Sequence, residues 1–213
     1  MENINFFRLD GDVMEKRKDK SLIVQTVGYG LDGTEYPRLL KVIMPVKSIF
    51  DQIKAGAKYR FMGELHKEPQ AEATLVADAA ETAELDENAE YYNLGLVAGQ
   101  LYQKSFTAAK PDKGKPQFIN LLIKAGNMLF TGVAFRGLCT TLKADAPEGS
   151  TVKIGGRLQR RKFSDGSDRY ATEIICQEDY TEILDAVDPE EALHPTSGKK
   201  LVAPAKAKKT KAV

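Results

Sequence analysis

Tryptophan is absent from this 213-residue sequence, and cysteine and histidine each occur only twice. Cys139 and Cys176 lie far apart without CxxC or Cys/His spacing, which argues against a zinc site and indicates a reducing compartment. We expect both to be small buried residues. His66 falls on an expected turn and His194 in the carboxy-terminal segment, and neither has the carboxylate pattern of a metal site or a catalytic triad. We therefore expect no enzymatic activity, no metal and no cofactor.

Long hydrophobic runs are also missing. The apolar stretches are interrupted by Lys or Gly and stay well short of the ~18 residues needed to span a bilayer. The first ten residues, MENINFFRLD, are acidic and lack the apolar core of a signal peptide. The sequence therefore predicts a cytoplasmic protein that does not contact a membrane.

Charge of one sign is not in excess, because 31 Lys and Arg face 30 Asp and Glu, for a net charge of +1. The chain as a whole exerts no long-range attraction on nucleic acid. Locally, no Lys or Arg occurs from Glu68 to Gln103, whereas Lys153 to Lys162 contains five cations and no acid. We expect the acidic stretch to be a solvated face or a linker that repels polyanions, and the basic stretch to attract them.

The composition changes beyond Val187 to Pro, Ala, Ser and Lys. Such a segment buries too little apolar surface to offset its chain entropy, so we expect a disordered basic tail over residues 188–213. The last fifteen residues carry six Lys and no acid. Both a solvated solubility tail and a phosphate-binding arm have this composition.

The rest of the chain predicts short β-strands separated by turns. Alternating or continuous apolar residues with many β-branched and aromatic side chains are typical of half-buried strands. The segments with this pattern are Leu22–Gly30, Leu39–Val46, Lys58–Leu65 and the stretch from Ala73. Helical patterns are short and occur only at Lys47–Lys54 and Leu138–Ala144. We therefore expect an all-β protein with short helices.

An internal repeat organises these elements. Ala55–Leu65 aligns without a gap with Glu148–Leu158, so that Gly63 matches Gly156 and Leu65 matches Leu158. A helical window precedes each copy, and a strand and a short TAEL or TEIL segment follow it. Upstream of each copy, a further expected strand contains a central glycine, which indicates a bend or bulge. These strands are Arg8–Lys16 and Leu96–Lys104.

Each half therefore contains three strands, a short helix and a β-hairpin. This is the element order of the five-stranded Greek-key barrel known as the OB-fold. We expect two tandem barrels, at residues 1–88 and 89–187, before the tail at 188–213. The alternative is that the repeat is a chance match within one irregular β domain.

The stretch from Leu129 to Leu184 carries a more specific pattern. Its parts are Phe135 at the end of an apolar run, a short helix, Gly149, V-x-I-x-G-x-L at Val152–Leu158, the basic run Arg161–Phe163, and Asp168–Glu173. The pattern resembles the carboxy-terminal half of the OB-fold in bacterial and phage single-stranded DNA-binding proteins. The resemblance implies sequence-nonspecific binding of single-stranded DNA in replication, recombination or repair. It also implies replication or recombination proteins as further partners.

Binding of single strands needs cations for the phosphates and aromatic faces on which bases stack. The expected hairpin from Arg157 to Tyr170 offers both, and in the resembling family the aromatics at the positions of Phe135 and Phe163 stack on bases. The candidate nucleic-acid-binding residues are Phe135, Arg136, Lys153, Arg157, Arg160, Arg161, Lys162, Phe163, Arg169 and Tyr170. Phe135 and Tyr170 could instead be core residues, and Phe163 a cross-strand packing residue.

The sequence departs from the family in two respects. Tryptophan platforms are replaced, for example by Phe163, which predicts weaker stacking. The chain ends KKTKAV rather than in an acidic tip, so recruitment of replication proteins by such a tip is not expected.

We call the expected hairpin from Arg157 to Tyr170 the basic arm. The first half lacks such an arm, because its last hairpin, at His66–Ala71, is shorter and carries no aromatic residue. We expect the second barrel to bind more strongly. Residues through which the first half could still contribute are Phe6, Phe7, Arg8, Lys16, Arg17, Lys18, Lys20 and Tyr36, with Glu15–Lys20 expected as a solvated loop.

Two other functions remain open. Tandem barrels could form a protein-interaction scaffold of a replication complex, and an RNA-binding protein would present the same residues because stacking ignores the sugar. With two barrels in one chain, we expect a monomer or a small homo-oligomer. The resemblance suggests a phage or bacterial origin, with the host cytoplasm as location if a phage encodes the protein.

Overall fold

The computed structural model describes residues 4–29, 34–67, 72–110, 116–162 and 170–187. The first half consists of β1 (Asn5–Lys16), β2 (Ser21–Tyr29), β3 (Glu35–Ile43), α1 (Lys47–Gln52), β4 (Lys58–His66), β5 (Thr74–Ala77) and β6 (Ala83–Glu84). The second half consists of β7 (Tyr92–Thr107), β8 (Phe118–Ala125), β9 (Met128–Phe135), α2 (Arg136–Asp145), β10 (Thr151–Lys162), β11 (Tyr170–Cys176), the 3-10 helix η2 (Glu178–Tyr180) and β12 (Glu182–Asp185). The prediction of a mostly β protein with short helices is confirmed, whereas the predicted tail lies outside the described residues.

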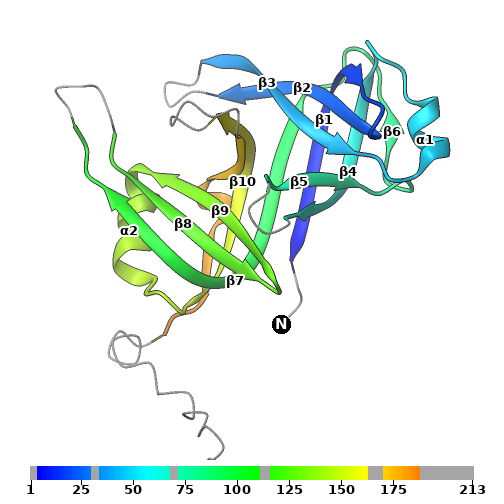
Figure 1. The fold of residues 1–213 in the computed structure, drawn as a ribbon. Helices are drawn as coiled ribbons and strands as arrows, with labels where there is room; N and C mark the ends of the chain where they lie inside the picture. Colours follow the sequence, from blue (N-terminus) through cyan, green and yellow to red (C-terminus); the bar gives the residue numbers. More distant parts are fainter. Residues whose placement is uncertain (1–3, 30–33, 68–71, 111–115, 163–169, 188–213) are drawn as a thin grey trace, which may run out of the picture.

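The described residues form one sheet of twelve strands (Figure 1). In the first half the pairings run β1–β2, β2–β3, β3–β5, β5–β4 and β4–β1, and so return to the first strand. In the second half they run β7–β8, β8–β9, β9–β11, β11–β10 and β10–β7. Both closed circuits contain one parallel pair, β3–β5 or β9–β11, at the same place. The expected order of three strands, helix and hairpin is therefore present twice.

The aligned repeat positions have the same structural role in both halves. Leu65 and Leu158 are buried in the core. Gly63 and Gly156 pair with the last residue of β5 and of β11, and a side chain at either glycine would overlap a carbonyl oxygen of that strand. Only glycine permits so close an approach of two backbones. The short segments β6 and β12 then pair with β4 and β10.

A second set of equivalent contacts fixes the ends of the hairpin strands. The Asn5 side chain donates to the Leu65 carbonyl at 2.8 Å and accepts from the Leu65 N–H at 3.0 Å. Asn93 makes the same two bonds with Leu158, at 2.9 and 2.8 Å. Each amide thus replaces one rung of a strand ladder, which ties the start of β1 or β7 to β4 or β10.

Equivalent lysines hold the helices in place. Lys16 Nζ donates to the carbonyl of Ile53, at the end of α1, at 2.5 Å. Lys104 Nζ donates to the carbonyl of Ala146, at the end of α2, at 2.7 Å. A cation at this place pairs with carbonyls that the helix itself leaves unsatisfied. Glu15 and Lys16 therefore belong to β1, which corrects the expectation of a solvated loop for these two residues. Arg17–Lys20 form an exposed turn, as expected.

The two halves are joined by antiparallel pairing of β1 with β7. Because Asn5 and Asn93 are equivalent, the pair Phe7 and Gly95 brings together equivalent positions of the two halves. The paired residues on either side are Asn5 with Val97 and Leu9 with Asn93. The junction therefore has a local two-fold symmetry. Phe7 is fully buried there and cannot serve as a stacking platform.

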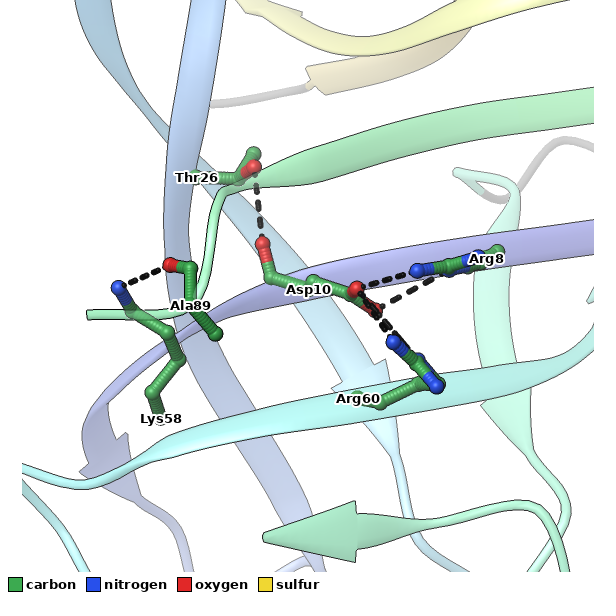
Figure 2. A network of polar contacts seen from close by, with 6 residues as sticks. All are labelled: Arg8, Asp10, Thr26, Lys58, Arg60 and Ala89. Atoms are coloured by element: carbon green, nitrogen blue, oxygen red, sulfur yellow. Dashed lines mark hydrogen bonds and ion pairs between the residues drawn. The ribbon is translucent and has the colours of Figure 1, made fainter. Parts of the chain in front are cut away.

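A buried ionic network lies beside this junction (Figure 2). The Asp10 carboxylate is almost fully buried and pairs with Arg8 at 2.7 Å and with Arg60 at 3.2 Å. Arg8 also lies over the ring of Tyr92 on β7, 4.3 Å from its centroid. Lys58 donates to the Ala89 carbonyl at 2.7 Å and so ties down the connection between the halves. Arg8, a candidate of the first half, is thus engaged inside the junction.

Other expectations concern burial and membranes. Cys139 and Cys176 are both buried free thiols, as expected. Across the described ranges, no helix combines the length and the apolarity that a membrane crossing requires.

We predict that Asn93→Ala lowers the free energy of unfolding by about 1–3 kcal/mol, because the Leu158 N–H and carbonyl lose their partner in a half-buried setting. Urea denaturation measures the change. Asn88→Ala serves as a control, since this exposed side chain should shift stability by less than about 0.5 kcal/mol. Equal stability of the two variants would show that the Asn93 bonds do not matter.

Candidate nucleic-acid interface

The outer face of strands β7, β8 and β9 is an accessible sheet surface in the second half. On β8, Ile119, Leu121 and Ile123 are buried in the core. The alternate residues Phe118, Asn120 and Leu122 are only half-buried, so they lie on the other face. The alternation therefore separates a core face from a face that can meet a ligand.

Two aromatic rings lie next to each other on this face. Phe118 of β8 pairs with Phe135 of β9, and their ring centroids are 5.9 Å apart at an interplanar angle of 45°. Both side chains are half-buried. Phe135 is one of the candidate residues named from the sequence, whereas Phe118 is not. The sequence contains the pattern that predicts this orientation of Phe118. Ile119 and Leu121 are apolar residues of one strand face, so the side chain of Phe118 has to point to the opposite face, away from the core.

A cavity of about 280 Å³ opens beside Phe135. Its lining consists of Phe135, Arg136, Leu138, Arg157, Ile175, Cys176, Gln177 and Glu178. Arg136 begins α2 with φ at +52°, a left-handed conformation that costs a non-glycine residue about 1 kcal/mol or more. The cavity combines an aromatic ring, two guanidinium groups and one carboxylate. Burial raises the pKa of the Cys176 thiol to about 12, so this thiol is neutral.

The basic arm begins on β10 and is attached to the first half. Arg160 pairs with Glu72 through two bonds of 2.7 and 3.0 Å, and its guanidinium lies 3.8 Å from the Tyr170 ring centroid. The Thr172 hydroxyl also donates to Glu72, at 3.0 Å. Glu72 lies within the acidic stretch, which was expected to be a solvated face or a linker. Here it is a partner of the arm instead.

Two further candidate cations each form an ion pair with a carboxylate of the second half. Arg161 pairs at 2.7 Å with Glu173, whose side chain is buried, and this hydrogen bond raises the pKa of Arg161. Lys153 pairs at 2.6 Å with Glu182 of β12. These cations are therefore largely neutralised within the chain, which reduces the attraction that they can exert on a phosphate.

The ten predicted residues thus fall into separate places. Phe135, Arg136 and Arg157 meet at the cavity, and Arg160 and Tyr170 meet at the root of the arm. Arg161 lies against Glu173 of β11, and Lys153 lies apart beside β12. Lys162 is exposed at the end of β10. Phe163 and Arg169 lie outside the described residues. The assignment of these residues to nucleic-acid binding stays a prediction.

We predict a favourable coupling of about 1 kcal/mol between Glu72 and Arg160, because both side chains are less than a third exposed and bind each other in a two-bond geometry. A double-mutant cycle of alanine variants, measured by urea denaturation, gives this value. The exposed pair Glu15 and Arg17 is the matched control and should couple by less than about 0.5 kcal/mol. Absence of coupling at Glu72 would mean that the contact does not hold the arm.

Comparison with solved structures relates this fold to known proteins. The crystal structure of wild-type single-stranded DNA-binding protein from Thermus aquaticus matches with a TM-score of 0.70 at 15% identity, covering 88% of this chain and 96% of that chain. A deletion mutant of the Thermus aquaticus protein matches with a TM-score of 0.67 at 18% identity, covering 89% and 98%. No family model and no curated protein matches the sequence. The resemblance to single-stranded DNA-binding proteins, first indicated by the pattern from Leu129 to Leu184, is therefore confirmed at the level of the fold.

Proposed function

We propose that this protein binds single-stranded DNA without sequence preference. The observation that carries the proposal is the pair of neighbouring rings, Phe118 and Phe135, on an accessible sheet face beside Arg136 and Arg157. Stacking of bases on such rings contributes roughly 1 to 3 kcal/mol per base and tolerates any sequence, because every base has a π-face. The fold likeness to a protein that is described as binding single-stranded DNA supports the same conclusion.

The proposal extends to the domain organisation. Each closed circuit of strands is an OB-fold barrel, with residues 1–88 as the first unit and 89–187 as the second. The second unit binds more strongly, because the rings and the long basic arm both belong to it. This division is supported by the equivalent Asn, Gly and Lys contacts in the two halves.

The biological role follows the same reasoning. A protein that covers bases and phosphates without reading sequence protects single strands during replication, recombination or repair. Its further partners are then replication or recombination proteins, and its place is the cytoplasm, that of the host if a phage encodes it. The protein has no catalytic activity in this proposal and acts as a monomer or small homo-oligomer.

A protein-docking scaffold is the second candidate. The internal pairing of Lys153, Arg160 and Arg161 with carboxylates favours it, because those cations attract a polyanion less strongly than free ones do.

The direct test is a fluorescence-anisotropy titration with a labelled oligo-dT of about 30 nucleotides, long enough for more than one OB-fold site. Matching RNA and duplex DNA are titrated alongside at two salt concentrations. We expect sub-micromolar binding to the single strand, weaker binding to duplex, and a steep fall with salt. Equal and weak binding to single strand and duplex would favour the scaffold, and preference for the RNA strand would assign an RNA-binding function.

We predict that Phe118→Ala lowers the affinity for oligo-dT about 5-fold to 100-fold, because one stacking platform is lost. The matched control is Phe106→Ala on β7. Phe106 is 39% exposed but pairs with Ile119, so it lies on the opposite face, where Lys143 covers its ring at 3.9 Å. The control should bind as the wild type does. An equal loss in both variants, or no loss in Phe118→Ala, would contradict the assignment of this face.

A further inference from the structure

The seam between the two halves brings β3 of the first half against β10 of the second. In Figure 1 the neighbouring ends of strands β2 and β3 on the side of the second half lie above β10. Tyr36 and Arg38 lie on β3 and Arg157 lies on β10, so the two contacting strands carry these three residues. The charge of Arg38 accordingly lowers the pKa of Arg157. The seam therefore places two guanidinium groups and an aromatic ring together, from two halves of the chain.

The Arg38 side chain is held flat against its own hairpin. Its guanidinium lies over the Tyr36 ring, 4.7 Å from the centroid. Its stem crosses over Gly28 of β2, where a Cβ atom would come within 2.7 Å of the Arg38 Cγ. Glycine at this position is thus what allows Arg38 to lie across the strand.

Arg38 is incompletely satisfied in this position. Its Nε is buried and has no hydrogen-bond partner among the described residues. The ion pairs between described residues give Arg38 no carboxylate either, whereas Arg160, Arg161 and Lys153 each have one. A buried donor without an acceptor is unfavourable.

Arg157 adds a second positive charge at the same place. Arg157 is half-buried, and this burial lowers its pKa. Tyr36 raises the pKa of Arg157, whereas the neighbouring charge of Arg38 lowers it further. The two groups carry like charges, and an anion beside Arg38 would lower the repulsion that the Arg157 pKa records. A phosphodiester provides such an anion, and its oxygens fit the planar fork of a guanidinium.

We propose that Arg38 and Arg157 form a phosphate-binding site at the seam, where a single strand passes from the second half onto the β2–β3 hairpin of the first half. This inference rests on the proposed function. Arg157 also lines the cavity beside Phe135, so the site continues the path that begins at the paired rings. The first half thereby takes part in binding although it lacks a long arm.

The test measures binding of oligo-dT of about 30 nucleotides to the full chain at several salt concentrations. Loss of one phosphate contact should reduce the slope of log K against log salt by about 0.7 for a single strand. We expect this reduction in Arg38→Ala, with a several-fold loss of affinity at low salt. Lys47→Ala is the charge-matched control, since Lys47 is exposed and paired with Asp51 on helix α1, which lies away from β10 (Figure 1).

Two further variants separate charge from packing. Arg38→Gln removes the charge but keeps a side chain of similar length. If Arg38→Ala melts at a lower temperature than the wild type, the binding comparison uses Arg38→Gln instead. Gly28→Ala keeps every charge but displaces the Arg38 side chain, so it should lower affinity in the same direction. Wild-type behaviour of the Arg38 variants and of Gly28→Ala would overturn the site while leaving single-strand binding by the protein intact. If the wild type itself does not bind single strands, the proposed function falls, and this site falls with it.

Discussion

The pairing of β1 with β7 is the constraint on which the rest of the structure depends. It joins two closed circuits into one sheet, and it does so between equivalent strands around Phe7 and Gly95. Because backbone hydrogen bonds fix register, the two halves cannot rotate or slide against each other without breaking the ladder. The contacts of β3 with β10 and of Glu72 with Arg160 follow from this fixed placement.

Repeated local contacts explain how two dissimilar sequences reach the same arrangement. The Asn5 and Asn93 amides, the Lys16 and Lys104 ammonium groups and the glycines at Gly63 and Gly156 each serve one requirement of backbone geometry. The surface between these points is free to differ. The surface of the second half carries the paired rings and the basic arm, whereas the first half presents Tyr36 and Arg38 at the seam.

For the proposed function, the distribution of paired and unpaired cations decides how the protein would attract a nucleic acid. With a net charge of +1, binding depends on where positive charge is left uncompensated. Arg160 and Arg161 have internal carboxylates, so a phosphate must compete with Glu72 or Glu173 for them. Arg38, without such a carboxylate among the described residues, is better placed to receive a phosphate directly. This arrangement predicts that affinity depends more on stacking and on the seam than on the total basic charge of the arm.

The sequence by itself determined the repeated β architecture, since period-two alternation and the aligned pair Gly63 and Gly156 depend on local backbone geometry. Its resemblance to a known family named Phe135 as a candidate for binding, and its period-two alternation predicted that Phe118 points away from the core. Only the tertiary structure decided which cations are compensated, because Arg160 meets Glu72 and Arg157 meets Arg38 across the seam, far apart along the chain. Such pairings depend on how the halves are joined through β1 and β7. A local pattern cannot encode that geometry, so charge runs in the sequence overstate the positive charge that the folded surface presents.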